Sequence, residues 1–266
     1  STWLTHEFPY IEYVNEINHQ VVDKYMTELW AGNISENTYN KHLTFFRSMF
    51  NAISINAGLN ENVWKKIDKL HLNSHHKEAL TLQQFSDVVN LSEGEMQTLL
   101  LIGFYTGLRL GDCCSLSWGN INLNTNVISL NSSKTKAEIN ICIHPMLMNL
   151  LINIEKRTNG YVLPEIQKLY SSGPTKITNK VKYLFQLAGI ETTEKREGGR
   201  RSIVKYGFHS LRHTFVSALH SAGVPQMVVE AIVGHNTKAV NDMYKHVKIN
   251  QIEEDINKKP EIRNEI

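Results

Sequence analysis

A polar interruption at residues 72–78 divides the hydrophobic pattern of this 266-residue chain into two segments. Its sequence, LNSHHKE, holds a single apolar residue, whereas apolar residues recur at regular spacing on both sides of it. A chain of this length is also longer than most single hydrophobic cores. The pattern therefore predicts a first domain at 1–79, a second at 80–248, and a C-terminal tail helix at 249–266.

The first segment has apolar residues at helical spacing in two stretches, at about 21–30 and 39–53. Ser35 precedes the second stretch and is a predicted N-cap, because its hydroxyl can accept a hydrogen bond from a free amide of the first helical turn. The segment is therefore expected to form a small helical bundle.

The second segment mixes helical and strand patterns. Thr81 and Gln84 form a capping-box signature. A further helix is expected to stop at Gly107, because glycine readily takes the left-handed conformation at a helix C-terminus. Alternation between 127 and 143 predicts a β-hairpin with its turn at 132–136. Later helices are expected at 145–156, 176–188, 209–221, 225–233 and 237–245. The predicted fold class is mainly α with a small β-sheet.

Composition indicates an ordinary soluble protein, with 41% hydrophobic and 20% charged residues. No apolar stretch is long enough for a membrane span, and no signal segment opens the sequence, so a cytoplasmic location is expected. The three cysteines, Cys113, Cys114 and Cys142, suit neither a disulfide framework nor a paired metal motif. They are expected to be small core residues in a reducing compartment.

The net charge of +2 is far from that of a protein that coats nucleic acid over its whole surface. Any contact with DNA is therefore expected to be local. A basic segment precedes His209, and its cations are Lys195, Arg196, Arg200, Arg201 and Lys205. Two interpretations stay open for it: a solvated loop or hairpin, or a basic arm along a phosphate backbone.

Five residues together indicate phosphodiester chemistry. Arg109 and Arg212 are permanently charged planar forks that can bind the non-bridging oxygens of one phosphate. Tyr244 offers an attacking oxygen that needs no metal ion, and His209 and His235 can transfer protons or donate hydrogen bonds. Each alone has an ordinary structural interpretation, such as a surface charge or a packed ring. Their joint occurrence favours the chemical one.

Their order and flanking sequences resemble the tyrosine recombinase (integrase) family. The matching features are TGLRLGD, HSLRHTF, GHN and a tyrosine nine residues after the histidine of GHN. The resemblance is specific over residues 80–250 and weak over 1–79. It implies a site-specific DNA recombinase in which a helical core-binding domain and a mixed α/β catalytic domain form a C-shaped clamp on double-stranded DNA.

The resemblance also implies how the strand is cut. Tyr244 would attack phosphorus and form a 3′-phosphotyrosine, while Arg109 and Arg212 would stabilise the charge that develops. Lys134 would protonate the leaving 5′ oxygen, with Lys136 as its competitor.

Three further roles are implied for neighbouring residues. His209 would assist proton transfer at Tyr244, His235 would donate a hydrogen bond to the phosphate, and Asp112 would orient a catalytic side chain without touching DNA. His209 and His213 are four residues apart and could share a zinc ion, but no third ligand is evident, so no metal site is predicted. No cofactor is expected either, because the covalent link conserves the energy of the broken bond.

The expected partners are DNA and other copies of the chain. The resemblance implies a monomer when free, a homo-tetramer in the synaptic complex, accessory DNA-bending or directionality proteins, and a place at the nucleoid rather than at a membrane. The stripe of Ile249, Ile252 and Ile256 would let the tail helix fold back onto its own domain or dock on a neighbouring protomer.

Two other functions stay in view. Type IB topoisomerases use a similar set of Arg, Lys, Arg, His and Tyr, and would relax supercoiled DNA as monomers. A non-catalytic DNA-binding regulator could keep the fold, although retention of the complete residue set argues against this.

Overall fold

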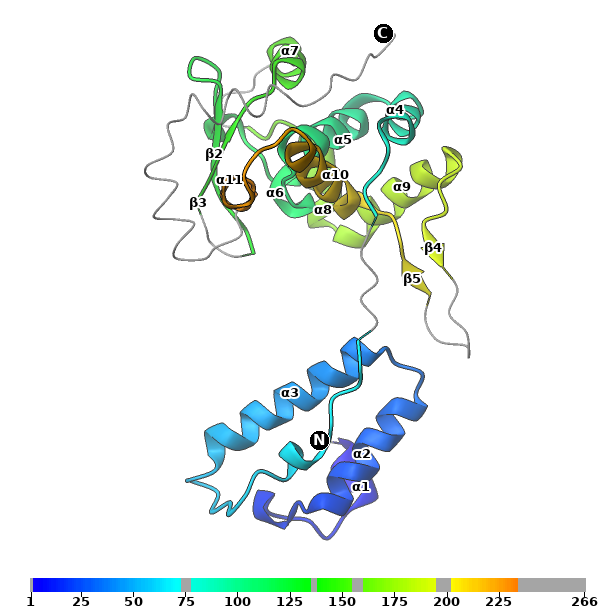
Figure 1. Cartoon of the computed structure of the whole chain (residues 1–266), viewed down its shortest axis with the longest axis vertical. Coiled ribbons are helices and arrows are strands. Elements are labelled where there is room, and N and C mark those ends of the chain that lie inside the picture. The colour runs from blue at the N-terminus through cyan, green and yellow to red at the C-terminus, as the bar shows by residue number, and fades with distance from the viewer. Residues whose placement is uncertain (1, 73–77, 135–137, 155–159, 195–201, 234–266) are drawn as a thin grey trace. The chain divides into compact units, whose positions relative to one another are not determined.

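The computed structural model describes residues 2–72, 78–134, 138–154, 160–194 and 202–233, which form two compact units (Figure 1). The first unit contains Ser1–His76 and Glu194–Ile203, and the second contains Lys77–Thr193 and Val204–Ile266. The division after His76 lies close to the boundary expected near residue 79.

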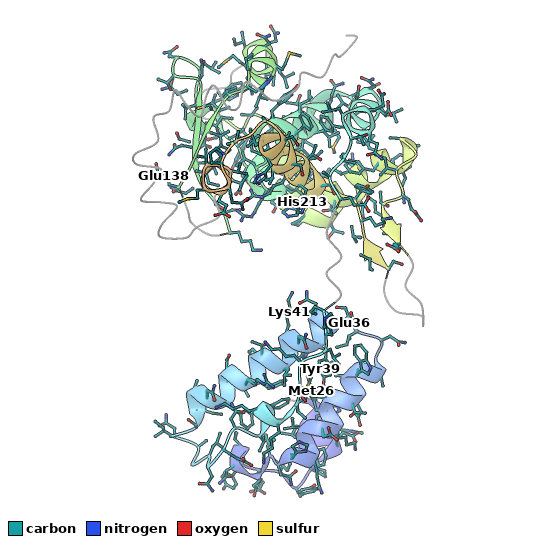
Figure 2. All side chains as sticks on the ribbon, in the orientation of Figure 1. Met26, Glu36, Tyr39, Lys41, Glu138 and His213 are labelled. Atoms are coloured by element: carbon teal, nitrogen blue, oxygen red, sulfur yellow. The ribbon has the colours of Figure 1, made fainter. Side chains whose placement is uncertain are left out.

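Helices make up the regular structure of the first unit between residues 2 and 72. They are α1 (Thr2–Glu7), the short 3-10 helix η1 (Val14–Glu16), α2 (His19–Ala31), α3 (Glu36–Ile53) and the 3-10 helix η2 (Val63–Lys66). The predicted N-cap at Ser35 is confirmed, since its hydroxyl accepts a hydrogen bond from the Thr38 amide. Met26 and Tyr39 belong to the core between α2 and α3 (Figure 2).

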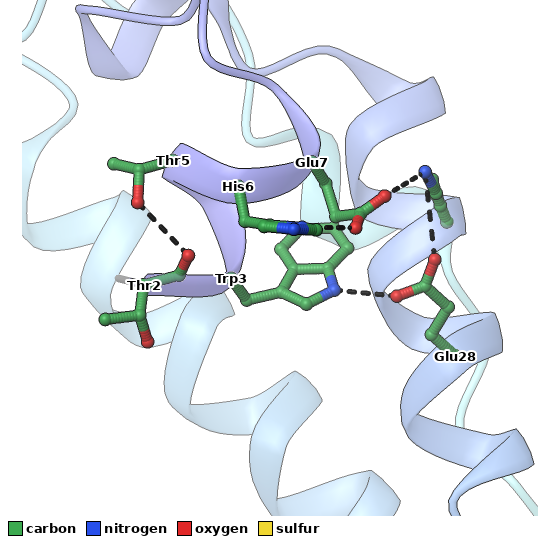
Figure 3. Close-up of polar contacts among 7 residues, drawn as sticks. Thr2, Trp3, Thr5, His6, Glu7 and Glu28 are labelled. Atoms are coloured by element: carbon green, nitrogen blue, oxygen red, sulfur yellow. Dashed lines mark hydrogen bonds and ion pairs between the residues drawn. The ribbon is translucent and has the colours of Figure 1, made fainter.

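The first helix, α1, has no buried residue and is attached to α2 by side-chain contacts (Figure 3). The Trp3 indole donates a hydrogen bond to Glu28 at 2.7 Å, and Lys24 pairs with Glu7 at 2.5 Å. The Trp3 ring also meets Tyr25 edge-on, with 5.0 Å between centroids. Contacts with α2, rather than burial of its own side chains, therefore hold α1.

The second unit combines helices with a small sheet. Its elements are α4 (Leu82–Asn90), α5 (Gly94–Thr106), α6 (Leu110–Cys114), η3 (Trp118–Asn120), β1 (Ile121–Asn122), β2 (Val127–Asn131), β3 (Glu138–Cys142), α7 (Pro145–Asn153), α8 (Pro164–Ser171), α9 (Pro174–Leu187), α10 (Phe208–Ser221) and α11 (Gln226–Ile232). The short strands β4 (Thr193–Glu194) and β5 (Ile203–Val204) pair with each other within the segment predicted as a loop or hairpin. The fold is mainly α with small sheets, as predicted.

The predicted hairpin is confirmed as β2 and β3, which pair antiparallel with Asn131 opposite Glu138, and β1 adds a third strand beside β2. The helix predicted at 145–156 is shorter than expected. It ends at Asn153, because Ile154 takes an extended conformation with φ −83° and ψ 131°. The sequence pattern did not predict α1, α6 or α8.

Helices α5 and α10 lie next to each other in the core of the second unit (Figure 1). Their close approach needs a glycine, since a Cβ atom at Gly103 would lie 2.5 Å from Cζ of Phe208. Leu211 and Phe215 are also fully buried in this core. The contact brings Arg212 of α10 to the C-terminal end of α5.

The first residues of the second unit are bonded to α10 and its approach. The Leu80 amide donates to Oγ1 of Thr214 at 2.9 Å, and the Tyr206 hydroxyl donates to Glu78 at 2.5 Å. Thr81 and Gln84 form the predicted capping box at the start of α4. Within the described ranges, no helix is both long and apolar enough to cross a membrane.

Candidate active site

The turn between α5 and α6 presents Arg109. Gly107 ends α5 in the left-handed conformation, with φ 63°, as predicted. Arg109 then takes the N-cap position of α6, is half-buried, and donates from Nη1 to Oγ of Ser132 at 3.1 Å. The glycine therefore turns the chain so that Arg109 faces the end of strand β2.

Arg212 is buried, with 4% of its surface exposed. Its Nη1 donates to the carbonyl oxygen of Gly107 at 2.9 Å, and its Nη2 donates to the carbonyl oxygen of Val233. Gly107 lies two residues before Arg109, and Val233 lies two residues before His235. The guanidinium of Arg212 thus joins α10 to the backbone just before two other predicted site residues, Arg109 and His235.

The two predicted phosphate-binding arginines are near enough for their charges to interact. Burial and, after it, the positive charge of Arg109 together lower the pKa of Arg212 to about 10, whereas the carboxylate of Asp112 opposes the shift. Like charges held together in a region of low dielectric constant destabilise each other. The arrangement would become more favourable with an anion bound between the two guanidinium groups.

Asp112 joins α6 to the turn of the hairpin. It is buried, and its Oδ1 accepts a hydrogen bond from the Ser133 amide at 2.8 Å. Lys134 follows directly in that turn and is exposed. The structure therefore brings Arg109, Asp112, Arg212 and the turn that carries Lys134 into one region of the second unit.

His209 lies in the first turn of α10, exposed and one helical turn before Arg212. Its ring meets His213 edge-on, with 5.0 Å between centroids. In the part of the chain that the structure describes, no three His, Cys, Asp or Glu side chains are grouped to hold a metal ion. A shared zinc site on His209 and His213 therefore gains no third ligand there.

Several predicted residues lie outside the described residues. They are Lys136, Lys195, Arg196, Arg200, Arg201, His235, Tyr244 and the tail at 249–266. Lys205 is described and half-buried, and its amide donates to the carbonyl oxygen of Thr192 at 3.0 Å. The cysteines Cys113, Cys114 and Cys142 are buried, as expected.

The structure adds three residues that sequence reasoning missed. Ser132 is fully buried against Arg109, Ser133 supplies the amide that Asp112 binds, and the hydroxyl of Tyr170 lies beside Gly111. The two serines precede Lys134 in the predicted turn, so their position in the sequence could have indicated that they lie near the site. Tyr170 lies on α8, which was not predicted, and carried no such signal.

Comparison with known proteins identifies the family of the chain. The family model described as "Phage integrase family" matches residues 73–251, so the chain belongs to the phage integrase family. A tyrosine recombinase of Thermosipho africanus is 21% identical over 245 residues, which cover 88% of this chain and 82% of that protein.

Two solved structures share the fold. The integrase of transposon Tn1549, solved with a circular intermediate DNA, aligns with a TM-score of 0.65 at 14% identity, covering 94% of this chain and 89% of that one. A lambda integrase tetramer bound to a Holliday junction aligns with a TM-score of 0.63 at 14% identity, covering 84% of this chain and 66% of that one.

Proposed function

We propose that this integrase-family protein is a site-specific DNA recombinase that cuts and rejoins strands through a covalent 3′-phosphotyrosine. The observation that carries the proposal is the pair of interacting guanidinium groups, Arg109 and buried Arg212, at the joint between α5, α6 and α10. Such a pair suits a phosphodiester, whose transition state holds more negative charge than its ground state. Membership of the phage integrase family supports the same activity.

The proposed cleavage step uses three reacting groups. The hydroxyl oxygen of Tyr244 bonds to phosphorus, and its proton passes to His209 or through it to water. The bond from phosphorus to the 5′ oxygen breaks, and that oxygen takes a proton from Lys134. Rejoining reverses these steps. The phosphotyrosine keeps the energy of the broken bond, so the cycle needs neither ATP nor a metal ion.

The remaining residues hold the reacting groups in place. Arg109 and Arg212 grip the phosphate oxygens, and His235 donates a further hydrogen bond to the phosphate. The link from Arg212 to the carbonyl of Val233 supports this role, because it fixes the chain two residues before His235.

At a larger scale, we propose that residues 1–79 form a core-binding domain and 80–248 the catalytic domain of a C-shaped clamp on DNA. The basic side chains at Lys195, Arg196, Arg200, Arg201 and Lys205 would lie along the phosphate backbone. The tetrameric lambda integrase bound to a Holliday junction supports assembly as a tetramer on two duplexes. Such an assembly would act at the nucleoid. The tail helix at 249–266 and accessory proteins would regulate that assembly.

The proposal is tested by trapping the covalent intermediate on a nicked target duplex. We expect the wild-type chain to form a protein–DNA adduct that survives denaturant, and Tyr244→Phe to form none while binding DNA normally. Tyr183→Phe is the matched control, since this tyrosine on α9 is 60% exposed and outside the proposed site. A normal adduct yield from Tyr244→Phe would refute the assignment. Relaxation of supercoiled DNA by one protomer, without synapsis, would favour the topoisomerase alternative.

A further inference from the structure

The two guanidinium groups of the candidate site differ in what holds them. Arg212 donates from Nη1 and Nη2 to the backbone carbonyls of Gly107 and Val233. Among the described residues, the guanidinium of Arg109 has one hydrogen-bond partner, the Oγ atom of Ser132, which accepts from Nη1 at 3.1 Å. The backbone therefore holds one arginine, whereas a single side-chain hydroxyl holds the other.

Ser132 is buried where strand β2 ends. The strand stops at Asn131, and Ser132 follows it with none of its surface exposed. A buried hydroxyl is unfavourable unless it is hydrogen-bonded, and the bond to Arg109 meets that need here. Water does not reach this hydroxyl to replace Arg109. The bond therefore restrains a side chain that is otherwise half-buried at a turn.

The nitrogen through which Arg109 is held decides which of its donors stay available. A guanidinium carries its N–H donors in one plane. The bond to Ser132 uses Nη1, and neither Nε nor Nη2 has a hydrogen-bond partner among the described residues. The N–H groups of these two atoms lie along one edge and can donate together to two oxygens of one phosphate. Arg109 therefore keeps a free fork, whereas both Nη atoms of Arg212 already donate to carbonyls.

We propose that Ser132 is a positioning residue whose buried hydroxyl, by holding Nη1 of Arg109, directs the Nε and Nη2 edge of that arginine toward the DNA phosphate. This inference rests on the proposed function, because it assigns Ser132 to the stabilisation of charge on the phosphate during cleavage. The physical reason is geometric, since a misplacement of about 1 Å can lower a rate by about 10²-fold.

A second role for Ser132 makes different predictions. Ser132 lies two residues before Lys134, so its bond to Arg109 also anchors the turn of the hairpin. If anchoring the turn were its main effect, loss of the hydroxyl would impair protonation of the leaving 5′ oxygen. If holding Arg109 is its main effect, the loss impairs stabilisation of the non-bridging oxygens, whichever atom leaves.

The first experiment measures single-turnover cleavage by the full chain on two nicked substrates, one ordinary and one with sulfur in place of the 5′-bridging oxygen. When the bond from phosphorus to sulfur breaks, the sulfur departs as a thiolate without a proton, so the second substrate does not need Lys134. We expect Ser132→Ala to be slowed about 10–10²-fold, by the same factor on both substrates. Recovery of the wild-type rate on the sulfur substrate would overturn the inference.

A double-mutant cycle tests whether Ser132 acts through Arg109. We expect Arg109→Ala to slow cleavage about 10²–10³-fold. Adding Ser132→Ala should slow it by no more than about twofold further, because the hydroxyl then has no guanidinium to hold. A further loss as large as that of Ser132→Ala alone would show that the two residues act independently, and would overturn the inference.

Ser132→Cys repeats both measurements with a side chain of similar size that is only a weak acceptor. It decides the question where Ser132→Ala folds poorly, which thermal unfolding reveals. Ser129→Ala is the matched control, because it removes an exposed hydroxyl that bonds to Asn140 in the same hairpin and should change neither rate. Wild-type rates from Ser132→Ala and Ser132→Cys would also overturn the inference. A wild-type chain that forms no adduct would instead refute the proposed function itself.

Discussion

Each unit contains an arginine whose guanidinium donates to backbone carbonyls, and the two arginines differ in the charges around them. In the first unit, Arg47 of α3 donates from Nε to the carbonyl of Trp64 at 3.1 Å and from Nη2 to that of Ile67. In the second unit, Arg212 of α10 donates to the carbonyls of Gly107 and Val233. Both side chains tie a helix to backbone carbonyls of other segments of the same unit.

The surroundings of Arg212 include a second guanidinium, that of Arg109, whose charge opposes its own. An arginine such as Arg47, whose donors bond to backbone carbonyls, is explained by a structural role. A second cation beside a buried arginine makes the folded chain less stable and is consistent with a site for an anion. If Arg212 binds a phosphate as proposed, hydrogen bonds alone do not distinguish it from a structural arginine such as Arg47, whereas the neighbouring charge of Arg109 does.

The sharpest test of this comparison changes each arginine to lysine. Arg212→Lys should lower single-turnover cleavage about 10²–10³-fold, because an ammonium cannot donate in the planar, two-pronged manner of a guanidinium. Arg47→Lys should leave cleavage at saturating DNA unchanged and lower the free energy of unfolding by about 1–3 kcal/mol. Equal losses of cleavage in the two variants would show that both arginines are structural.

The second test compares two glycines with nearly equal left-handed conformations, Gly107 with φ +63° and Gly58 with φ +60°. Alanine at either position should cost about 1–2 kcal/mol in backbone conformation. A Cβ at Gly107 would also lie 2.5 Å from Cδ1 of Phe215, whereas one at Gly58 meets nothing within 4 Å. Gly107→Ala should therefore cost about 1–3 kcal/mol more.

Urea unfolding of the two glycine variants measures this difference. The Gly107 carbonyl also accepts from Arg212, so Gly107→Ala should slow cleavage as well as lower stability. Equal stability losses at the two positions would contradict the close packing between Gly107 and Phe215.

The smallest expected effect concerns the pH dependence of stability, to which one surface contact in each unit contributes. The hydrogen bond to Glu78 raises the pKa of Tyr206 to about 12, from 10.0. The folded state therefore holds this proton more tightly than the unfolded state, so the contribution is complete below pH 10 and lost as pH rises towards 12. Tyr206→Phe should flatten the alkaline decline in stability, by at most about 1 kcal/mol for so exposed a pair.

In the first unit, hydrogen bonding to Lys24 and His6 lowers the pKa of Glu7 below 4.5. The contribution of Glu7 is therefore present above pH 4.5 and lost as the solution becomes more acidic. Glu7→Gln should flatten the acid side of the profile. Because Glu7 also raises the pKa of Lys24 above 10.5, the same change should remove the contribution that this pair loses at high pH. Thermal unfolding between pH 3 and pH 12 measures both effects, and an unchanged acid side in Glu7→Gln would contradict the assignment.

Features that depend on neighbours in the sequence were predicted well. Thr81 and Gln84 cap α4, Ser35 caps α3 and Gly107 ends α5, because each device acts within about one helical turn. Helices α6 and α8 were missed since α6 has only five residues and α8 buries a single residue, Ile166. Five residues are too few to show a helical period, and a single buried residue gives α8 no apolar face that would reveal one.

The candidate site was predictable in its residue types but not in its contacts. The matching motifs identified Arg109, Asp112, Lys134, His209 and Arg212 as candidates. That Arg212 is buried runs against the usual exposure of arginine, and its carbonyl partners lie 105 and 21 residues away in the sequence. Contacts across such separations follow from the packing of α5 against α10, which no local pattern encodes.

The attachment of residues 78–80 to the rest of the second unit bears on how such proteins can be recombined in the laboratory. The Glu78 carboxylate and the Leu80 amide are bonded to Tyr206 and Thr214. A chimera that borrows the first unit of another integrase should therefore place its junction before Glu78. A junction a few residues later would replace the Glu78 carboxylate, which accepts from Tyr206 two residues before the helix that carries His209 and Arg212. An exchange meant to alter target choice would then also disturb the approach to that helix.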